Sequence, residues 1–118
     1  MFAASLASVV EKVDGAQGAA VLNLDGVVIE AVDATGSSVA ADEAIGDYAS
    51  VFRQLFGVTE AAHLGEVQKL SVEGSDRVTL VRALDDNYVV ALQVEPGTIL
   101  GRAHFYLRVA APDLAREL

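Results

Sequence analysis

Cysteine is absent from this sequence of 118 residues, and basic side chains are few. Without cysteine the chain has no disulfide framework and no thiolate metal site, which fits a reducing compartment. Eight lysines and arginines stand against 17 acids, which gives a net charge of −9. Nucleic acids and anionic membranes bind clustered basic side chains, so this charge disfavours both as partners. It is compatible with a basic protein partner.

Long apolar runs and targeting signals are also missing. No apolar run approaches the roughly 20 residues of a membrane span. The N-terminus, Met-Phe-Ala-Ala-Ser-Leu, lacks the basic region that opens a signal peptide. We therefore expect a cytoplasmic protein without membrane insertion. What the chain does have is 53% apolar residues, enough to build the core of one domain over residues 1–118.

An antiparallel hairpin is predicted close to the N-terminus. Asp25-Gly26 separates two apolar runs, residues 18–24 and residues 27–32. Such a pair is a strong hairpin signal, because a type I′ turn needs positive φ at both central positions. Both runs are apolar at nearly every position, which predicts that both faces of both strands are covered.

Two helices are predicted from apolar side chains at helical spacing. Residues 2–13 form the first, which ends at Gly15. Residues 42–63 form the longest helix, and Asp42 is its N-cap or a first-turn acid. Apolar side chains cover about half the circumference of this helix, which is more than packing on one sheet requires. The surplus predicts a second cover, and it consists of Tyr48, Val51, Leu55 and Val58.

Three strands are predicted after the long helix, at residues 66–73, 77–84 and 88–94. Short polar turns separate them, so we expect antiparallel neighbours. In the first of these strands the alternation predicts one face shared by Val67, Lys69 and Ser71.

The C-terminal stretch, residues 98–118, fits two structures. Its polar and apolar residues alternate as in a strand, but an equally good helical stripe runs from Leu100 to Leu118. Pro112 would break or kink a helix unless it opens a final turn.

The sequence carries no recognisable active site. His63 and His104 are far apart, and no nucleophile elbow, phosphate loop or dinucleotide fingerprint is present. The clustered acids of the long helix are explained more simply as a solvated first turn than as a metal site; they are Asp42, Glu43 and Asp47. We therefore expect no enzyme, no cofactor and no metal.

The polar side of the long helix offers better interaction signals. Glycine in a helix interior costs about 1 kcal/mol relative to alanine, so two glycines in one helix suggest close packing against a partner. The alternative is that small residues are tolerated at the surface. The small residues lie beside Gln54 and are Gly46, Ser50, Gly57 and Ala61. Arg53 is more simply a solvated arginine than a finger that completes a partner's phosphoryl-transfer site.

Three stretches of the chain resemble one known family. The first is Gly-Ala-Gln-Gly-Ala-Ala-Val-Leu-Asn-Leu-Asp-Gly-Val-Val-Ile at residues 15–29, and the second is Asp-Asn-Tyr-Val-Val-Ala-Leu-Gln-Val at residues 86–94. They resemble the first hairpin and the fifth strand of the Roadblock / dynein light chain family. Residues 98–118 resemble the closing helix of its bacterial MglB-like members.

The resemblance implies an α+β sandwich of order αββαβββα. Its five-stranded antiparallel sheet has strand order 2-1-5-4-3, with the long helix on one face and the terminal helices on the other. Residues 98–118 then form a helix, whose last turns we expect to be kinked or short at Pro112. Members of the family dimerise by pairing their third strands and packing their long helices side by side. The positions implied for this homodimer interface are Tyr48, Val51, Leu55, Val58, Val67, Lys69 and Ser71.

The same resemblance implies a function. Family members bind small Ras-like GTPases, and the MglB-like ones activate GTP hydrolysis by remodelling switch regions, without an arginine finger. The implied GTPase-binding positions are Asp47, Ser50, Gln54, Gly57 and Ala61. The alternative is a dimeric adaptor or scaffold subunit with no effect on GTP hydrolysis. A small-molecule sensor is a weaker third hypothesis, because no polar cluster that would form a cavity is apparent.

Overall fold

The computed structural model describes residues 2–41 and 44–118, so Met1 and the predicted N-cap Asp42 lie outside the described residues. The element order is αββαβββα, as predicted. The helices are α1 (Phe2–Lys12), α2 (Ile45–Ala61) and α3 (Leu100–Arg116). The strands are β1 (Ala16–Asn23), β2 (Val28–Asp33), β3 (Lys69–Glu73), β4 (Val78–Ala83) and β5 (Tyr88–Val94).

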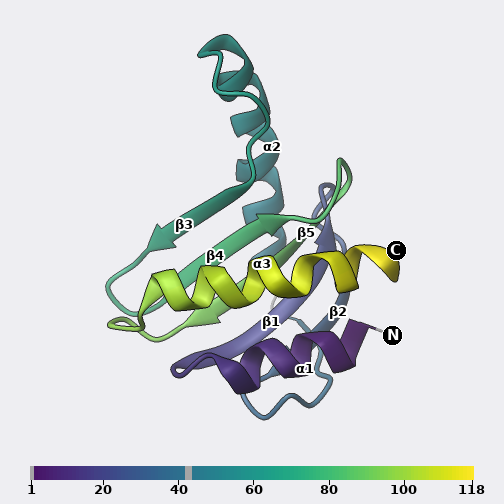
Figure 1. Ribbon diagram of the computed structural model, residues 1–118, viewed down its shortest axis with the longest axis vertical. Helices are drawn as coiled ribbons and strands as arrows, with labels where there is room; N and C mark the ends of the chain where they lie inside the picture. The colour runs from purple at the N-terminus through teal and green to yellow at the C-terminus, as the bar shows by residue number, and fades with distance from the viewer. Residues whose placement is uncertain (1, 42–43) are drawn as a thin grey trace.

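The strands form one five-stranded antiparallel sheet in the order β2-β1-β5-β4-β3, which confirms the expected topology (Figure 1). The central strand β5 pairs with β1 along most of their length, for example Ala91 with Ala20. Strands β2 and β3 therefore form the two edges of the sheet.

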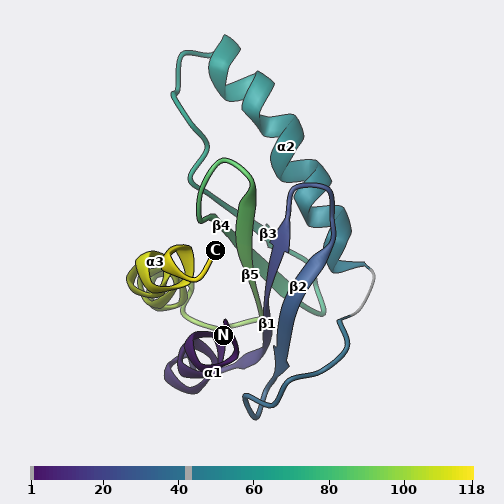
Figure 2. The same cartoon turned by 90° about the vertical axis from the view of Figure 1, so that its right-hand side faces the viewer.

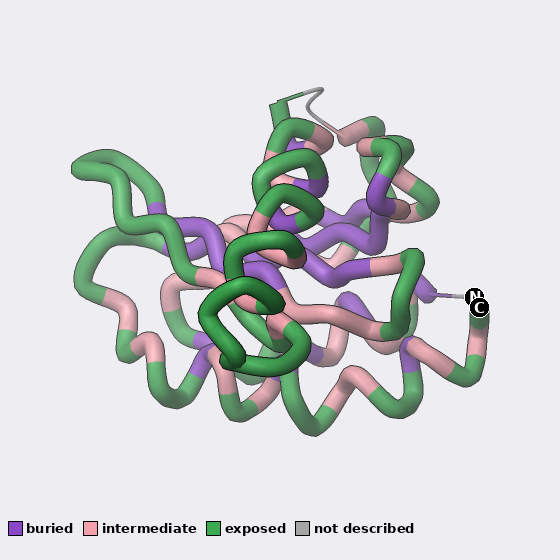
Figure 3. Tube along the Cα trace, turned by 90° about the horizontal axis from the view of Figure 1, so that it is seen from above, coloured by how far each residue is buried: buried purple, intermediate pink, exposed green. Residues whose placement is uncertain are grey.

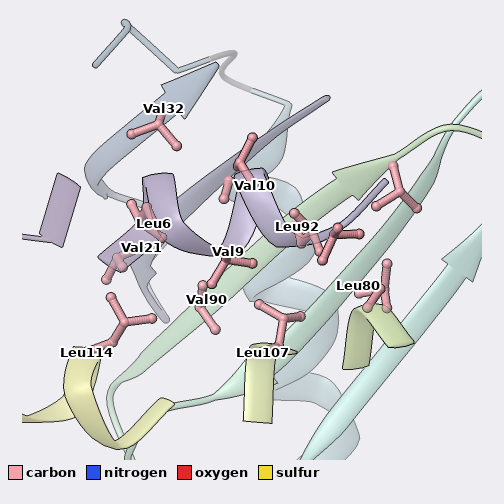
Figure 4. Close-up of a cluster of buried hydrophobic side chains, with 14 of the residues drawn as sticks. Leu6, Val9, Val10, Val21, Val32, Leu80, Val90, Leu92, Leu107 and Leu114 are labelled. Atoms are coloured by element: carbon pink, nitrogen blue, oxygen red, sulfur yellow. The ribbon is translucent and has the colours of Figure 1, made fainter. Parts of the chain in front are cut away.

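Helix α2 covers one face of the sheet, and α1 and α3 cover the other (Figure 2). On the α2 side, the fully buried Phe52 and Ala49 pack with strand residues such as Leu22. On the opposite side, Leu6 of α1 and Leu107 of α3 belong to one cluster of buried side chains over the sheet (Figure 4). Burial of each large apolar side chain contributes about 1.5–3 kcal/mol, and this fixes both helix layers.

The C-terminal stretch is a helix. Ala103, Leu107 and Leu114 are fully buried, which selects the helical stripe over the strand alternation. The helix continues through Pro112 to Arg116, so the expectation of shortened last turns is wrong. The physical reason is that Leu114 anchors the turn beyond the proline in the core. Pro112 has no backbone N–H, so one hydrogen bond of the helix is missing. Because Pro112 lies on the exposed side of the helix, the missing bond is not in the core.

The turn of the β1–β2 hairpin is not of the expected type. Of its two central residues only Gly26 has positive φ, at 88°. The side-chain Oδ1 of Asn23 accepts hydrogen bonds from the backbone N–H groups of Asp25 and Val27, each at 3.0 Å. These bonds organise the turn with a single left-handed residue. The predicted cover of both β2 faces is also wrong, since β2 is an edge strand and Ile29 is exposed.

The second half of α2 extends beyond the end of the sheet, and the following segment returns to β3 (Figures 1 and 3). Every residue from 60 to 66 is exposed. Strand β3 begins at Lys69, later than predicted. Val67 thus precedes the strand and packs with the α2-side cluster, and the predicted face shared with Lys69 and Ser71 is wrong for this residue. The projecting end of α2 gives the molecule a surface that the sheet does not cover.

Candidate functional site

The five residues predicted to bind a GTPase lie on one face of α2. All are exposed, and their spacings of three and four residues place them in a single stripe. We call this stripe the polar face of α2; its members are Asp47, Ser50, Gln54, Gly57 and Ala61. The structure brings these residues together on an accessible surface.

The two glycines of α2 differ in what surrounds them. A Cβ atom on Gly46 would lie 2.6 Å from the carbonyl oxygen of Gly26, so α2 approaches the β1–β2 turn too closely for a side chain. A Cβ atom on Gly57 would meet no atom within 4 Å. Packing within the chain therefore explains Gly46, and partner contact is not needed there. Among the described residues no packing explains Gly57.

Arg53 also ties α2 to the β1–β2 turn. Its Nη2 donates a hydrogen bond to Asp25 Oδ1 at 2.9 Å, and both side chains are exposed. An exposed ion pair of this kind contributes about 0–1 kcal/mol, so it orients the arginine more than it stabilises the fold. Arg53 is the only arginine of α2. Its guanidinium is engaged with the protein's own hairpin.

A second face of α2 is apolar and lacks cover. Val51 is 44% exposed and Val58 is 59% exposed, while Tyr48 and Leu55 are half-buried. These four residues form the apolar face of α2, and they are the predicted surplus. Beyond the helix end the exposed Leu64 extends the apolar surface. Tyr48 also packs against the buried cluster on the α2 side, so the exposed part of this face consists mainly of Val51 and Val58. Exposed apolar side chains that gather on one face are typical of protein–protein contacts.

Strand β3 supplies an open sheet edge. It pairs with β4 on one side only, from Lys69–Arg82 to Glu73–Val78. The opposite edge of the sheet is partly covered, because Val39 donates a backbone hydrogen bond to Ala31 at 3.0 Å. Exposed strand edges present unpaired N–H and C=O groups that can pair with another chain. Among the described residues, β3 is thus the more open of the two edges.

An open groove of about 1010 Å³ lies beneath the projecting end of α2. Phe56, Val67 and Leu84 supply apolar lining, and acids such as Glu66 and Asp85 surround it. The groove exists because α2 extends past the sheet, so no pattern in the sequence indicated it. It is open to solvent and adjoins β3 through residues 65–68.

Ser71 of β3 makes a contact that the sequence did not indicate. Its Oγ lies 2.7 Å from His104 Nε2 on α3, while His104 Nδ1 is buried and has no hydrogen-bond partner among the described residues. Burial, with Lys69 and Arg82 nearby, lowers the pKa of His104. A serine–histidine pair needs a third group to orient the imidazole for nucleophilic chemistry, and Nδ1 lacks one. The contact directs the Ser71 side chain toward α3.

The part of the chain that the structure describes holds no cluster of histidine and acidic residues that would bind a metal ion. Of the three clustered acids, Asp47 is exposed on α2, whereas Asp42 and Glu43 lie outside the described residues. Within the described ranges no helix combines the length and hydropathy needed to cross a membrane.

Comparison with known proteins identifies the fold. No family model matches the sequence, and no curated protein matches it significantly. Among solved structures, MglC from Myxococcus xanthus is 29% identical, with a TM-score of 0.70 over 99% of this chain and 98% of that one. Myxococcus xanthus MglB has a TM-score of 0.83 at 14% identity, over 98% and 92% of the two chains.

Two further structures extend this picture. A Roadblock/LC7 domain from Streptomyces avermitilis has a TM-score of 0.74 at 14% identity, over 96% of this chain and 93% of that one. An MglB with a tetrameric arrangement has a TM-score of 0.74 at 20% identity, over 96% and 84%. The chain therefore has the Roadblock fold, and its structural neighbours are Roadblock/LC7 domain proteins with MglB and MglC among them.

Proposed function

We propose that this chain is a single Roadblock-like domain, residues 1–118, which forms a cytoplasmic homodimer and regulates a small Ras-like GTPase by binding it. The observation that carries the proposal is the polar face of α2. Gly57 is exposed there at a cost in helix stability, and no contact with residues 2–41 or 44–118 explains that cost. A partner that packs closely against the helix would explain it. In this proposal the protein is a regulator and has no active site of its own.

The apolar face of α2 and the open edge of β3 support the homodimer. Burying Val51 and Val58 against a second copy removes their exposed area from water in both protomers. Pairing β3 with β3 satisfies its free backbone groups at the same time. In this interface Lys69 and Ser71 contribute backbone at the strand edge, while Val67 lies next to it. The tetrameric arrangement of an MglB is consistent with self-association on this fold.

The two α2 faces can serve two partners at once. At about 100° per residue, the stripe around Gln54 and the stripe around Leu55 point in different directions from one helix. The homodimer would bury the apolar face and leave the polar face open for the GTPase. Because Arg53 pairs with Asp25, α2 supplies no free arginine to the nucleotide, and regulation would depend on how the surface contacts the GTPase.

Charge variants on α2 test GTPase binding. Gly57→Arg with Ala61→Arg should abolish binding of a small Ras-like GTPase loaded with a GTP analogue, while light scattering still shows the dimer. Gly101→Arg is a matched control, because Gly101 is an exposed helix glycine whose Cβ would also meet open space. Unchanged binding by the α2 variant would refute the proposed contact.

A dimeric adaptor that leaves GTP hydrolysis unchanged is the second candidate. Arg53 is directed to the protein's own hairpin, so the contact with a GTPase would come from the helix surface alone, and an adaptor needs no more than such a contact. GTP turnover by the bound GTPase, measured with and without this protein, separates the two. Faster turnover supports the regulator, and an unchanged rate at saturating protein supports the adaptor.

A further inference from the structure

The exposed side of α3 differs in charge from the rest of the molecule. The chain has 17 acids and only eight basic residues, yet three of the eight lie on this one helix surface and no acid does. The surface is about one third of the helix circumference and faces away from the buried Leu107. We call it the outer face of α3; its members are Gly101, Arg102, Phe105, Arg108, Val109, Pro112 and Arg116, and all are exposed.

Two of these arginines have no acidic partner. Arg102 and Arg108 make no ion pair among the described residues, whereas Arg116 pairs with Asp113 at the border of the face. The guanidinium of Arg108 lies over the ring of Phe105, 5.5 Å from its centroid. This stacking holds both side chains on the surface in a fixed arrangement. With no carboxylate of the described residues paired to them, these two guanidinium groups are available to an external carboxylate.

Apolar surface accompanies the charge. Phe105 is 47% exposed and Val109 is 50% exposed, so neither belongs to the core. Beside Val109 a groove of about 230 Å³ runs between α1 and α3. Tyr106 also lines it, and the groove carries one basic residue, Lys12, and one acid, Asp113, which is already paired with Arg116. A groove of this size accommodates one or two apolar side chains.

We propose that the outer face of α3 binds an acidic amphipathic segment of a partner protein. Its carboxylates would pair with Arg102 and Arg108, and its apolar side chains would contact Phe105 and enter the α1–α3 groove. A lipid surface fits less well, because an extended anionic membrane faces the whole molecule with its net charge of −9, whereas a short segment faces only this basic surface. The face lies on the opposite side of the sheet from α2 (Figure 2). Binding there is therefore compatible with the proposed function and independent of it.

The probe is a synthetic amphipathic helical peptide with leucine on one side and glutamate on the other. In an NMR titration of the full chain, it should shift amide signals of α3 and α1 and leave those of α2 unchanged. Its affinity should fall at least about tenfold when salt rises from about 50 to about 300 mM, since screening weakens exposed charge pairs. The same peptide with lysine in place of glutamate should not bind.

Charge reversal assigns the site. Arg102→Glu with Arg108→Glu should weaken peptide binding at least about tenfold, and Arg102→Gln with Arg108→Gln should weaken it less. Arg77→Glu is the control, because Arg77 is exposed at the β3–β4 turn. Circular dichroism confirms that each variant folds. Failure of the acidic peptide to bind, equal binding by the α3 variants, or binding to phosphatidylserine vesicles but not to the peptide would overturn the proposal.

Discussion

Gly57 is the residue at which the structure makes an unusual stability prediction. Replacing it by alanine should stabilise the isolated protein, because a helix interior favours alanine and the added Cβ meets no atom within 4 Å. Most substitutions destabilise, so a gain in stability here is informative. The reasoning also predicts a loss of GTPase affinity, since the same methyl group would stand between the helix and a closely packed partner.

The expected gain is about 0.5–1 kcal/mol, the difference between glycine and alanine in a helix interior. For a domain of 118 residues, an unfolding entropy of about 2.1 cal/mol/K per residue converts this gain to a rise in Tm of about 2–4 °C. The self-association constant should not change, because Gly57 belongs to the polar face of α2 and not to the apolar face.

Urea denaturation followed by circular dichroism measures the effect, at several protein concentrations to separate folding from dimerisation. Gly46→Ala is the matched control in the same helix. Its new Cβ would lie 2.6 Å from the Gly26 carbonyl oxygen, so this variant should lose about 1–3 kcal/mol. A loss of stability in Gly57→Ala, or equal effects of the two substitutions, would show that Gly57 already has a packing role within the protein or its dimer. That result would refute the partner-contact argument.

Three further predictions concern the dimer surface, the Ser71–His104 contact and the attachment of α2. Val58→Asp should raise the dimer dissociation constant at least about thirtyfold, because about 1 kcal/mol of apolar burial is lost in each protomer. Analytical ultracentrifugation measures this constant. Val39→Asp is the control, because Val39 is an exposed valine in the loop after β2, and it should leave the constant unchanged. Burial and two neighbouring cations lower the pKa of His104, so the folded state favours the neutral imidazole. The stability that this gives is fully present above the unfolded pKa near 6.5, and it is lost as pH falls through the lower pKa of the folded state. Unfolding measured from pH 8 to pH 5 should show this decline, and a decline equally steep in His104→Gln would contradict it. Phe52→Ala should cost about 3–5 kcal/mol by leaving a cavity between α2 and the sheet, and a loss below about 1 kcal/mol would mean that α2 is held elsewhere.

Much of the fold follows from local patterns in the sequence. The apolar spacing of residues 42–63 and the turns between strands correctly predict α2 and the antiparallel sheet. For residues 98–118 local patterning was insufficient, since strand and helix fitted equally well. Burial of Leu107 and Leu114 over the sheet decides for the helix, and burial is a property of the assembled fold.

The surfaces were harder to predict because they depend on contacts between distant segments. The polar face of α2 is visible in the sequence, since its residues repeat at helical spacing. The contact of Gly46 with Gly26 is not visible, and neither is the pairing of Ser71 with His104 across 33 positions. The groove beneath α2 could not be predicted either, because it forms only where the helix extends beyond the end of the sheet.

Hydrogen–deuterium exchange tests the central proposal most directly. The protein is compared with and without a small Ras-like GTPase from the same genome, loaded with a GTP analogue. We expect slower exchange in α2, centred on residues 47–61, with α3 unchanged. Protection confined to α3, or no protection of α2 at GTPase concentrations that saturate binding, would contradict the claim that α2 is the GTPase-binding surface.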